Sequence, residues 1–169
     1  MGLNNIVQYS SPVQLPGTTW GSGEYQLAVG SKIMFNVKTD GTLWTMGEND
    51  YGNLGQNQAH NSGDVSSPVQ VGSDTTWSKV ATRRGETTGA IKTDGTMWAW
   101  GKNSYGQCGD SSDVHRSSPV QIPGTTWSII STTDNHSGAI KTDGTLWMWG
   151  QNSSGNLGQN DRTQRSSPV

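Results

Sequence analysis

The side chains that most often carry out chemistry are few in this sequence and far apart. Its three histidines, His60, His115 and His136, stand at no spacing that is typical of metal ligands, and Cys108 is the one cysteine. A single cysteine cannot form an intrachain disulfide, and the sequence has no Gly-x-Ser-x-Gly elbow and no phosphate-binding loop. We therefore expect no catalytic residue, no metal, no cofactor and no enzymatic activity.

The most regular charged groups are the lysine and aspartate of a repeated pentapeptide, Lys-Thr-Asp-Gly-Thr. Such pairs could form a ring of ligand-binding loops, but Asp-Gly between alternating apolar flanks is a strong signal for a tight hairpin turn. We interpret the aspartate and glycine as turn residues with positive φ, and the lysine as a charge that keeps an exposed tip soluble. The glycines assigned to this structural role are Gly41, Gly95 and Gly144.

The pentapeptides belong to an internal repeat of about 50 residues. Ser-Ser-Pro-Val occurs four times, and a lone tryptophan occurs at Trp20, Trp77 and Trp127. The segment from the lysine to a closing glycine has the same length in every repeat, whereas the segments around it vary. Constant length indicates paired strands, and variable length indicates surface loops. Cys108 takes the register that leucine holds in the other repeats, which predicts a small buried plug.

A strand of alternating apolar residues is expected after each turn, since Leu-Trp-Thr-Met, Met-Trp-Ala-Trp and Leu-Trp-Met-Trp follow the three pentapeptides. Residues two apart share one face of a strand. The indoles could form a platform that stacks sugars or bases, but a repeated apolar position is more typical of packing between neighbouring sheets. We expect Trp98 and Trp147 to be mostly buried. The residues assigned to this packing are Trp44, Trp98, Trp100, Trp147 and Trp149.

The composition narrows the classes of function. The net charge is −2, so the chain lacks the basic surface that binds nucleic acid or an anionic membrane. No apolar run approaches the length of a transmembrane helix, and the first residues lack the basic and apolar regions of a secretion signal. We expect no nucleic-acid partner and no insertion into a membrane.

Short strands without helical periodicity predict an all-β protein built of β-propeller-type blades of about 50 residues, with three repeats present and an incomplete ring. The expected division has a lead-in or cap at residues 1–9, repeats at 10–65, 66–116 and 117–165, and the start of a fourth repeat at 166–169.

The combined motif SSPVQIPGTTW (residues 117–127) and GAIKTDGTLWMWGQN (residues 138–152) resembles the repeats of the regulator of chromosome condensation family, in the form common in bacterial and viral proteins. The resemblance runs from about Ser10 to Val169 and implies four-stranded blades, usually seven to a ring. Repeats of this kind need neighbours on both faces. We therefore expect the third blade to be covered by further repeats of a longer chain, by a second copy or by another protein.

The loops that do not repeat are where we expect a partner to bind. The resemblance and these loops favour a non-catalytic structural or interaction module that presents variable loops to a protein or a surface. The style of the repeats suggests a phage virion or tail, so a virion or extracellular surface is the expected location, with the cytoplasm as the alternative. The loop residues selected are Tyr25, His60, Arg83, Arg84, His115, Arg116 and Arg162.

Two other functions stay open at this point. A bacterial surface or secreted adhesion module would bind a surface glycan through exposed aromatic rings such as Tyr25, Tyr51 or Tyr105. A guanine-nucleotide exchange factor is the best-known role in the family that the chain resembles. That role needs a wedge inserted into a small GTPase, and no segment of this sequence matches one.

Overall fold

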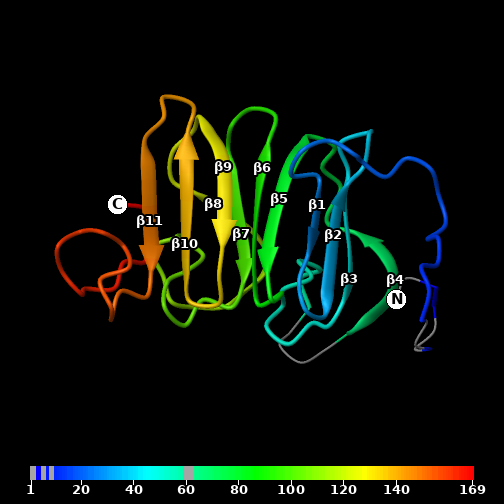
Figure 1. Cartoon of the computed structure of the whole chain (residues 1–169), viewed down its shortest axis with the longest axis horizontal. Coiled ribbons are helices and arrows are strands. Elements are labelled where there is room, and N and C mark those ends of the chain that lie inside the picture. Colours follow the sequence, from blue (N-terminus) through cyan, green and yellow to red (C-terminus); the bar gives the residue numbers. More distant parts are fainter. Residues whose placement is uncertain (1–2, 5–6, 8–9, 59–62) are drawn as a thin grey trace.

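The computed structural model describes residues 3–4, 7, 10–58 and 63–169, and within these residues every regular element is a β-strand. The strands form three antiparallel sheets, which confirms the predicted all-β fold (Figure 1). The described residues include no helix that is long and apolar enough to cross a membrane.

The first sheet consists of β1 (Leu27–Val29), β2 (Ile33–Val37), β3 (Leu43–Gly47) and β4 (Val65–Gln70). The second consists of β5 (Trp77–Arg83), β6 (Thr87–Lys92), β7 (Met97–Gly101) and β8 (Arg116–Ile122). The third consists of β9 (Trp127–Thr132), β10 (His136–Lys141) and β11 (Leu146–Gly150).

The second and third copies of Ser-Ser-Pro-Val, Ser66–Val69 and Ser117–Val120, lie in the last strand of the sheet whose other strands precede them in the chain. Pro68 lies in β4 and Pro119 in β8, and each of these strands is at the edge of its sheet. Proline is tolerated there because it has no N–H to donate to a neighbouring strand. A repeat counted from this tetrapeptide therefore begins with the last strand of one sheet and continues with the first three strands of the next sheet.

The last residues of the chain follow the same pattern on the third sheet. Arg165 forms a β-bridge with Gly150, and Val169 and Met148 exchange two backbone hydrogen bonds of 3.0 and 3.1 Å. Ser166–Val169 therefore lies beside β11, where the other sheets have their fourth strand. The equivalent pairs of the second sheet are Arg116 with Gly101 and Val120 with Ala99.

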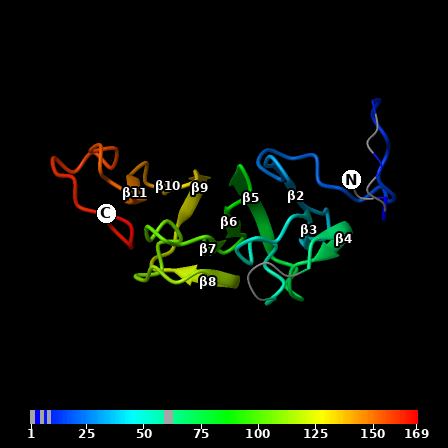
Figure 2. The ribbon, with the colours of Figure 1, turned by 90° about the horizontal axis from the view of Figure 1, so that it is seen from below.

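The three sheets stand side by side and pack face against face. Strand β1 contacts β5, and β5 contacts β9, so the first strands of the three sheets lie next to one another. The outer strands β4 and β8 lie toward the other side of the molecule (Figure 2). The sheets form an arc of blades that does not close into a ring, as the repeat count predicted.

Two apolar clusters hold the sheets together. The cluster between the first and second sheets contains Phe35, whose ring meets that of Trp100 edge to face, with 5.7 Å between the ring centroids. The cluster between the second and third sheets contains Met97, Cys108 and Trp149. Trp100 and Trp149 are completely buried. A buried indole removes more apolar surface from water than any other side chain, so these two residues dominate the contacts between sheets.

Each hairpin turn has one residue with positive φ, the glycine, and the expectation of positive φ at the aspartate as well is wrong. The φ angles are 78° at Gly41, 79° at Gly95 and 85° at Gly144. In the first turn Gly41 N donates to Lys38 O at 2.9 Å, and Lys38 N donates to Thr42 O at 2.8 Å. This is a three-residue loop with glycine in the left-handed region, a common alternative to the two-residue turn.

The aspartate of each pentapeptide begins a short chain of hydrogen bonds. Asp94 Oδ1 accepts from the backbone N and the Oγ1 of Thr96, at 2.9 and 2.7 Å, and Thr96 Oγ1 accepts from Trp98 Nε1 at 3.1 Å. The first and third hairpins contain the same chain of bonds. The repeated spacing of aspartate, threonine and tryptophan is therefore explained by one local structure.

The lysine of each pentapeptide lies over indole rings. Lys92 Nζ is 4.0 Å from the ring centroid of Trp98 and 4.8 Å from that of Trp77, and Lys38 and Lys141 are arranged in the same way. A cation–π contact contributes from about 0.5 kcal/mol at an exposed site to about 2 kcal/mol when desolvated, and the side chain of Lys92 is only 10% exposed. The lysine thus packs on the blade as well as carrying charge. The rings of the pentapeptide strands that it contacts, Trp44, Trp98 and Trp147, keep a minor part of their surface exposed, and Trp98 and Trp147 pack against the clusters between sheets, as expected.

The hairpin aspartates make the stability of the folded protein depend on pH in the acid range. Hydrogen bonds from Thr42, Thr96 and Thr145 hold the pKa values of the three carboxyl groups below their ordinary value of 3.8. A group whose pKa is lower in the folded state stabilises fully above its unfolded pKa and loses that contribution as pH falls through the folded value.

We expect the urea midpoint of unfolding to fall as the pH drops below about 4, the ordinary range of an aspartate. Replacing all three aspartates by asparagine (Asp40→Asn, Asp94→Asn, Asp143→Asn) should reduce this dependence, because the amide does not titrate, while Asp110 and Asp161, whose pKa values are also lowered, account for the remainder. An equally steep acid loss in the triple variant would show that other carboxyl groups cause it.

Candidate functional site: the loop face

The two ends of the sheets differ in sequence and in structure. The repeated pentapeptide hairpins lie at one end, at the top in Figure 1, and the glycine-rich loops that follow β3, β7 and β11 lie at the other. The short loops before β2, β6 and β10 share this second end, which we call the loop face. The loop face carries most of the sequence that varies between repeats.

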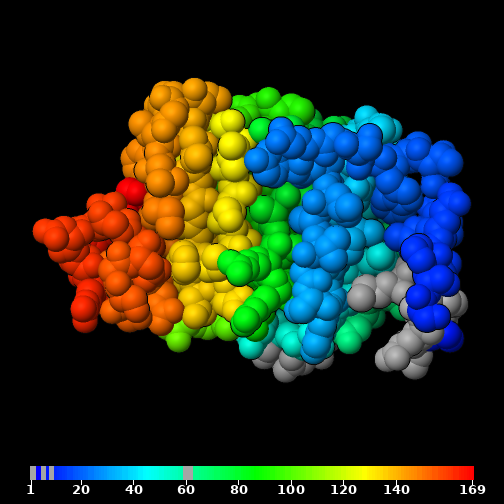
Figure 3. Space-filling model, viewed as in Figure 1, coloured from blue at the N-terminus to red at the C-terminus, as the bar shows by residue number. Residues whose placement is uncertain are grey.

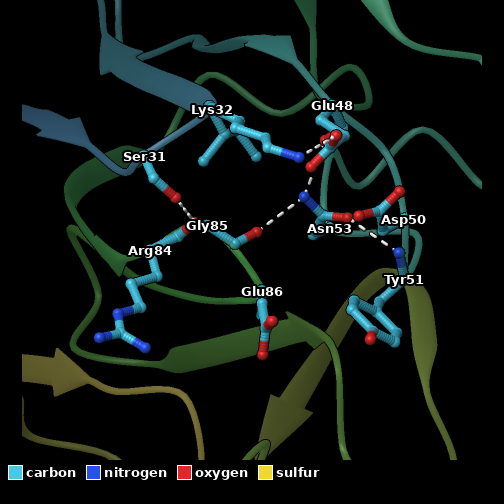
Figure 4. Close-up of a pocket in the computed structure, with 10 residues that line it drawn as sticks. Ser31, Lys32, Glu48, Asp50, Tyr51, Asn53, Arg84, Gly85 and Glu86 are labelled. Carbon is cyan, nitrogen blue, oxygen red and sulfur yellow. Dashed lines mark hydrogen bonds and ion pairs between the residues drawn. The ribbon is translucent and has the colours of Figure 1, made fainter.

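A cavity of about 160 Å³ opens between the first and second blades on the loop face (Figure 4). Asn53 bridges the two blades, since its Nδ2 donates to Glu48 O at 2.8 Å and to Gly85 O at 2.7 Å. Ser31 Oγ donates to Arg84 O at 2.7 Å, which forms a second link between the blades. The cavity walls are thus fixed by hydrogen bonds to backbone.

Two ion pairs flank this cavity, one from each blade, and the lysine and the glutamate exchange places between them. Lys32 pairs with Glu48 at 2.6 Å, and Lys102 pairs with Glu86 at 2.7 Å. Lys32 and Glu86 hold equivalent places before β2 and β6, so the sign of the charge is reversed from one blade to the next. The hydrogen bond and the charge of Glu48 raise the pKa of Lys32. The loop face therefore presents alternating charge rather than one dominant sign.

Arg84 lies at the junction of this cavity and a larger hollow of about 430 Å³ between the second and third blades. Its φ of 54° is in the left-handed region, and its guanidinium pairs with Asp134 at 2.8 Å while the side chain stays 71% exposed. Arg83, also exposed, and the half-buried His136 line the same hollow. A planar guanidinium held at an exposed site suits recognition of a carboxylate or of another protein surface.

Arg116 stabilises the loop in which it lies. It pairs with Asp110, whose side chain is only 3% exposed, at 2.5 Å. Burial would raise the pKa of Asp110, but hydrogen bonds from Arg116 and Ser112 outweigh burial and lower it. Because it neutralises a buried carboxylate, Arg116 contributes to the structure of the loop.

The other selected residues lie in three places. His115 is half-buried, with its ring 5.3 Å from that of Tyr51, and its Nδ1 accepts a bond from Asn103 N at 2.9 Å. Arg162 is exposed on the loop of the third blade. Tyr25 is exposed before the start of β1, so it stands apart from the loop face, and His60 lies outside the described residues.

Sequence reasoning missed the ion pairs that line the cavity. Lys32 and Glu48 lie in the most divergent repeat, and the signal that could have identified them is the reversed charge at the equivalent Glu86 and Lys102. Among the described residues, no group of three or more His, Cys, Asp or Glu could hold a metal ion. Cys108 is fully buried, and burial raises the pKa of its thiol.

The sheets, their repeated hairpins and their contacts define a protein built of β-propeller blades. Models of the Regulator of chromosome condensation (RCC1) repeat match residues 40–82, 94–140 and 127–156. The chain therefore belongs to the family of proteins with this repeat.

The proteins that this chain resembles are longer than the chain itself. It is 33% identical over 86 residues to the E3 ubiquitin-protein ligase HERC2 of Homo sapiens and to that of Mus musculus, and the match covers 50% of this chain and 2% of HERC2. Among solved structures, human WBSCR16 aligns with a TM-score of 0.71 at 23% identity, over 85% of this chain and 38% of WBSCR16. Prp20p of Saccharomyces cerevisiae aligns with a TM-score of 0.74 at 17% identity, over 85% of this chain and 37% of Prp20p. The chain thus spans well under half the length of these relatives.

Proposed function

We propose that the chain is a non-catalytic interaction module whose loop face binds a protein partner. The observation that carries the proposal is Arg84, an exposed guanidinium on a constrained backbone between two hollows with charged linings. Such a surface can match a partner with complementary charges, which favours specificity and fast association. Prp20p, which has the same fold, is described with binding to Gsp1p and histones, and yeast RCC1 (Prp20) has been solved with Kap60, which supports a protein ligand.

Within this function we favour a virion or phage-tail location, because near-identical repeats with small polar loops suit a rigid surface component. Mass spectrometry of purified particles from the source tests this. Recovery of the chain from particles at constant stoichiometry is expected, and recovery from the soluble cell fraction alone would contradict it.

The glycan alternative lacks a supporting observation. Lysine amines lie over the rings of Trp44, Trp98 and Trp147, so the repeated tryptophans do not offer a free stacking platform. A sugar would have to rely on scattered rings such as the exposed Tyr25.

A photo-crosslinking amino acid at position 83, on the loop face, tests the proposed surface in material from the source. We expect one protein to be captured at several-fold higher yield than by the same probe at the exposed position 24, near Tyr25. The substitution Arg84→Glu should reduce capture by the probe at position 83, because it reverses the charge beside the probe.

The matched control is Glu24→Lys, which should leave capture by the probe at position 83 unchanged. Equal capture from both positions, or no effect of Arg84→Glu, would show that the loop face is not the binding surface.

A further inference from the structure

The small cavity between the first and second blades keeps one negative charge that no ion pair neutralises. Two of its carboxylates are paired, Glu48 with Lys32 at 2.6 Å and Glu86 with Lys102 at 2.7 Å. The third, Asp50, is half-buried in the cavity lining and forms no ion pair within the described part of the chain. Glu48 first, and then Asp50, raise the pKa of Lys32, but only Glu48 forms an ion pair with it. The Asp50 carboxylate is therefore left for a partner.

The larger hollow between the second and third blades keeps a charge of the opposite sign. Arg84 is paired with Asp134 at 2.8 Å, whereas Arg83 lines the same hollow, is exposed and forms no ion pair with a described residue. The exposed Ser153 and Ser154 of the third blade line the hollow as well. A guanidinium without a counter-ion, with hydroxyl groups around it, suits a carboxylate.

Neither of these two charges belongs to the repeat. Asp50 stands in Gly-Glu-Asn-Asp, where the second and third repeats have Ser104 and Ser153 at the same place. Arg83 ends β5, and the segments that join the first and second strands of the other two blades contain no arginine. The packing of blades, which the repeated residues serve, therefore does not explain Asp50 or Arg83.

The small cavity and the larger hollow adjoin at Arg84, which lines both. Figure 4 shows Asp50 and Arg84 on opposite sides of the small cavity. Figure 3 shows the segment that joins β5 to β6, in green, protruding between the first blade in blue and the third blade in yellow to orange. The charge left after pairing is thus ordered on the loop face, negative toward the first blade and positive toward the third.

We propose that the protein bound by the loop face presents two opposite charges in the matching order, a carboxylate beside Arg83 and a lysine or arginine beside Asp50. This inference rests on the proposed function, because it names the surface chemistry of the partner that the loop face binds. A partner with this pattern is attracted at both places, and in the reverse orientation it is repelled at both, so the pattern also sets the orientation. A uniformly acidic or basic partner would be attracted at one place and repelled at the other.

The test uses an uncharged photo-crosslinking amino acid at position 153, which is exposed and lines the larger hollow. In material from the source, Arg83→Glu and Asp50→Lys should each lower capture of the partner by about fivefold. The double variant keeps the net charge of −2 and should lower capture further, so that a loss cannot be due to net charge. Mass spectrometry of the crosslinked peptide should find an acidic residue close to the crosslink.

The matched control for Asp50→Lys is Glu24→Lys, which makes the same change of charge at an exposed position away from the loop face. It should leave capture from position 153 unchanged. The circular dichroism spectra of all variants should match that of the unsubstituted chain, because neither Asp50 nor Arg83 is part of an ion pair.

The sign of each effect decides the result. Higher capture by Asp50→Lys with lower capture by Arg83→Glu would show a uniformly acidic partner, and the opposite signs would show a uniformly basic one. Either result, or unchanged capture in both variants, would overturn the proposed charge pattern while leaving the loop face as the binding surface. If the unsubstituted chain captures no protein from position 83 or position 153, the proposed function itself fails and the charge pattern fails with it.

Discussion

Replacement of Trp100 by alanine is expected to lower the free energy of unfolding by about 3–5 kcal/mol. Trp100 is completely buried between the first two sheets, where it contacts Phe35, and its Nε1 donates to the carbonyl of Asn53 across the interface. The substitution leaves a large cavity and an acceptor without its donor, so both apolar contact and a hydrogen bond are lost. Urea unfolding followed by circular dichroism measures the change.

Trp98 provides the control, since it stands on the same strand and face but is half-buried. Trp98→Ala should cost less than Trp100→Ala, because Trp98 keeps contact with water in the folded protein and has less surface to lose. Trp100→Phe retains most of the ring but removes the N–H, and should fall between the two. A larger loss at Trp98 than at Trp100 would mean that the hairpin, not the interface between sheets, limits stability.

The repeat made much of the fold predictable. Short apolar runs at constant spacing predicted the strands, and the structure has them at Ile33–Val37, Thr87–Lys92 and His136–Lys141 and in the strands that follow. The arrangement into blades came from the need of each unit to bury both faces, which one 50-residue repeat cannot do alone. Edge placement of proline followed from its missing N–H.

Local chemistry was harder to predict. The type of turn depends on whether one or both central residues have positive φ, and Asp-Gly is compatible with either. The aspartate is used as an acceptor for Thr96 N and Oγ1, which a backbone-based turn rule does not consider. The lysine was interpreted as a soluble tip because sequence spacing does not show that Trp77, fifteen positions earlier, lies beside Lys92.

The ion pairs of the loop face could be identified only from the structure. Its ion pairs join residues that are far apart in sequence, such as Arg84 and Asp134, and the pairing depends on how adjacent blades are aligned. Charge in a loop predicts exposure, but it does not predict which charges neutralise one another. Arg116 illustrates the limit, because its partner Asp110 is buried and turns an apparent binding residue into a structural one.

The second large effect is expected at Gly41, in a series that separates backbone strain from contact between blades. Gly41, Gly95 and Gly144 have nearly equal φ angles, so alanine at each should cost the same strain, about 1–2 kcal/mol. Their surroundings differ. A Cβ at Gly41 would lie 2.0 Å from Thr75 O in the segment that leads to the second blade, one at Gly95 would lie 3.1 Å from Thr126 N, and one at Gly144 meets no described atom within 4 Å.

Gly41→Ala should therefore cost about 1–3 kcal/mol more than Gly144→Ala. The carbonyl of Thr75 is part of the backbone, so the clash with the new Cβ is relieved only if the segment that leads to the second blade moves away from the first. Gly95→Ala should be intermediate, since a contact of 3.1 Å needs a shift of only a few tenths of an ångström. Urea unfolding of the three single variants gives the order directly. Equal losses at all three positions would mean that turn strain alone sets the cost and that the hairpin tips do not contribute to packing between blades.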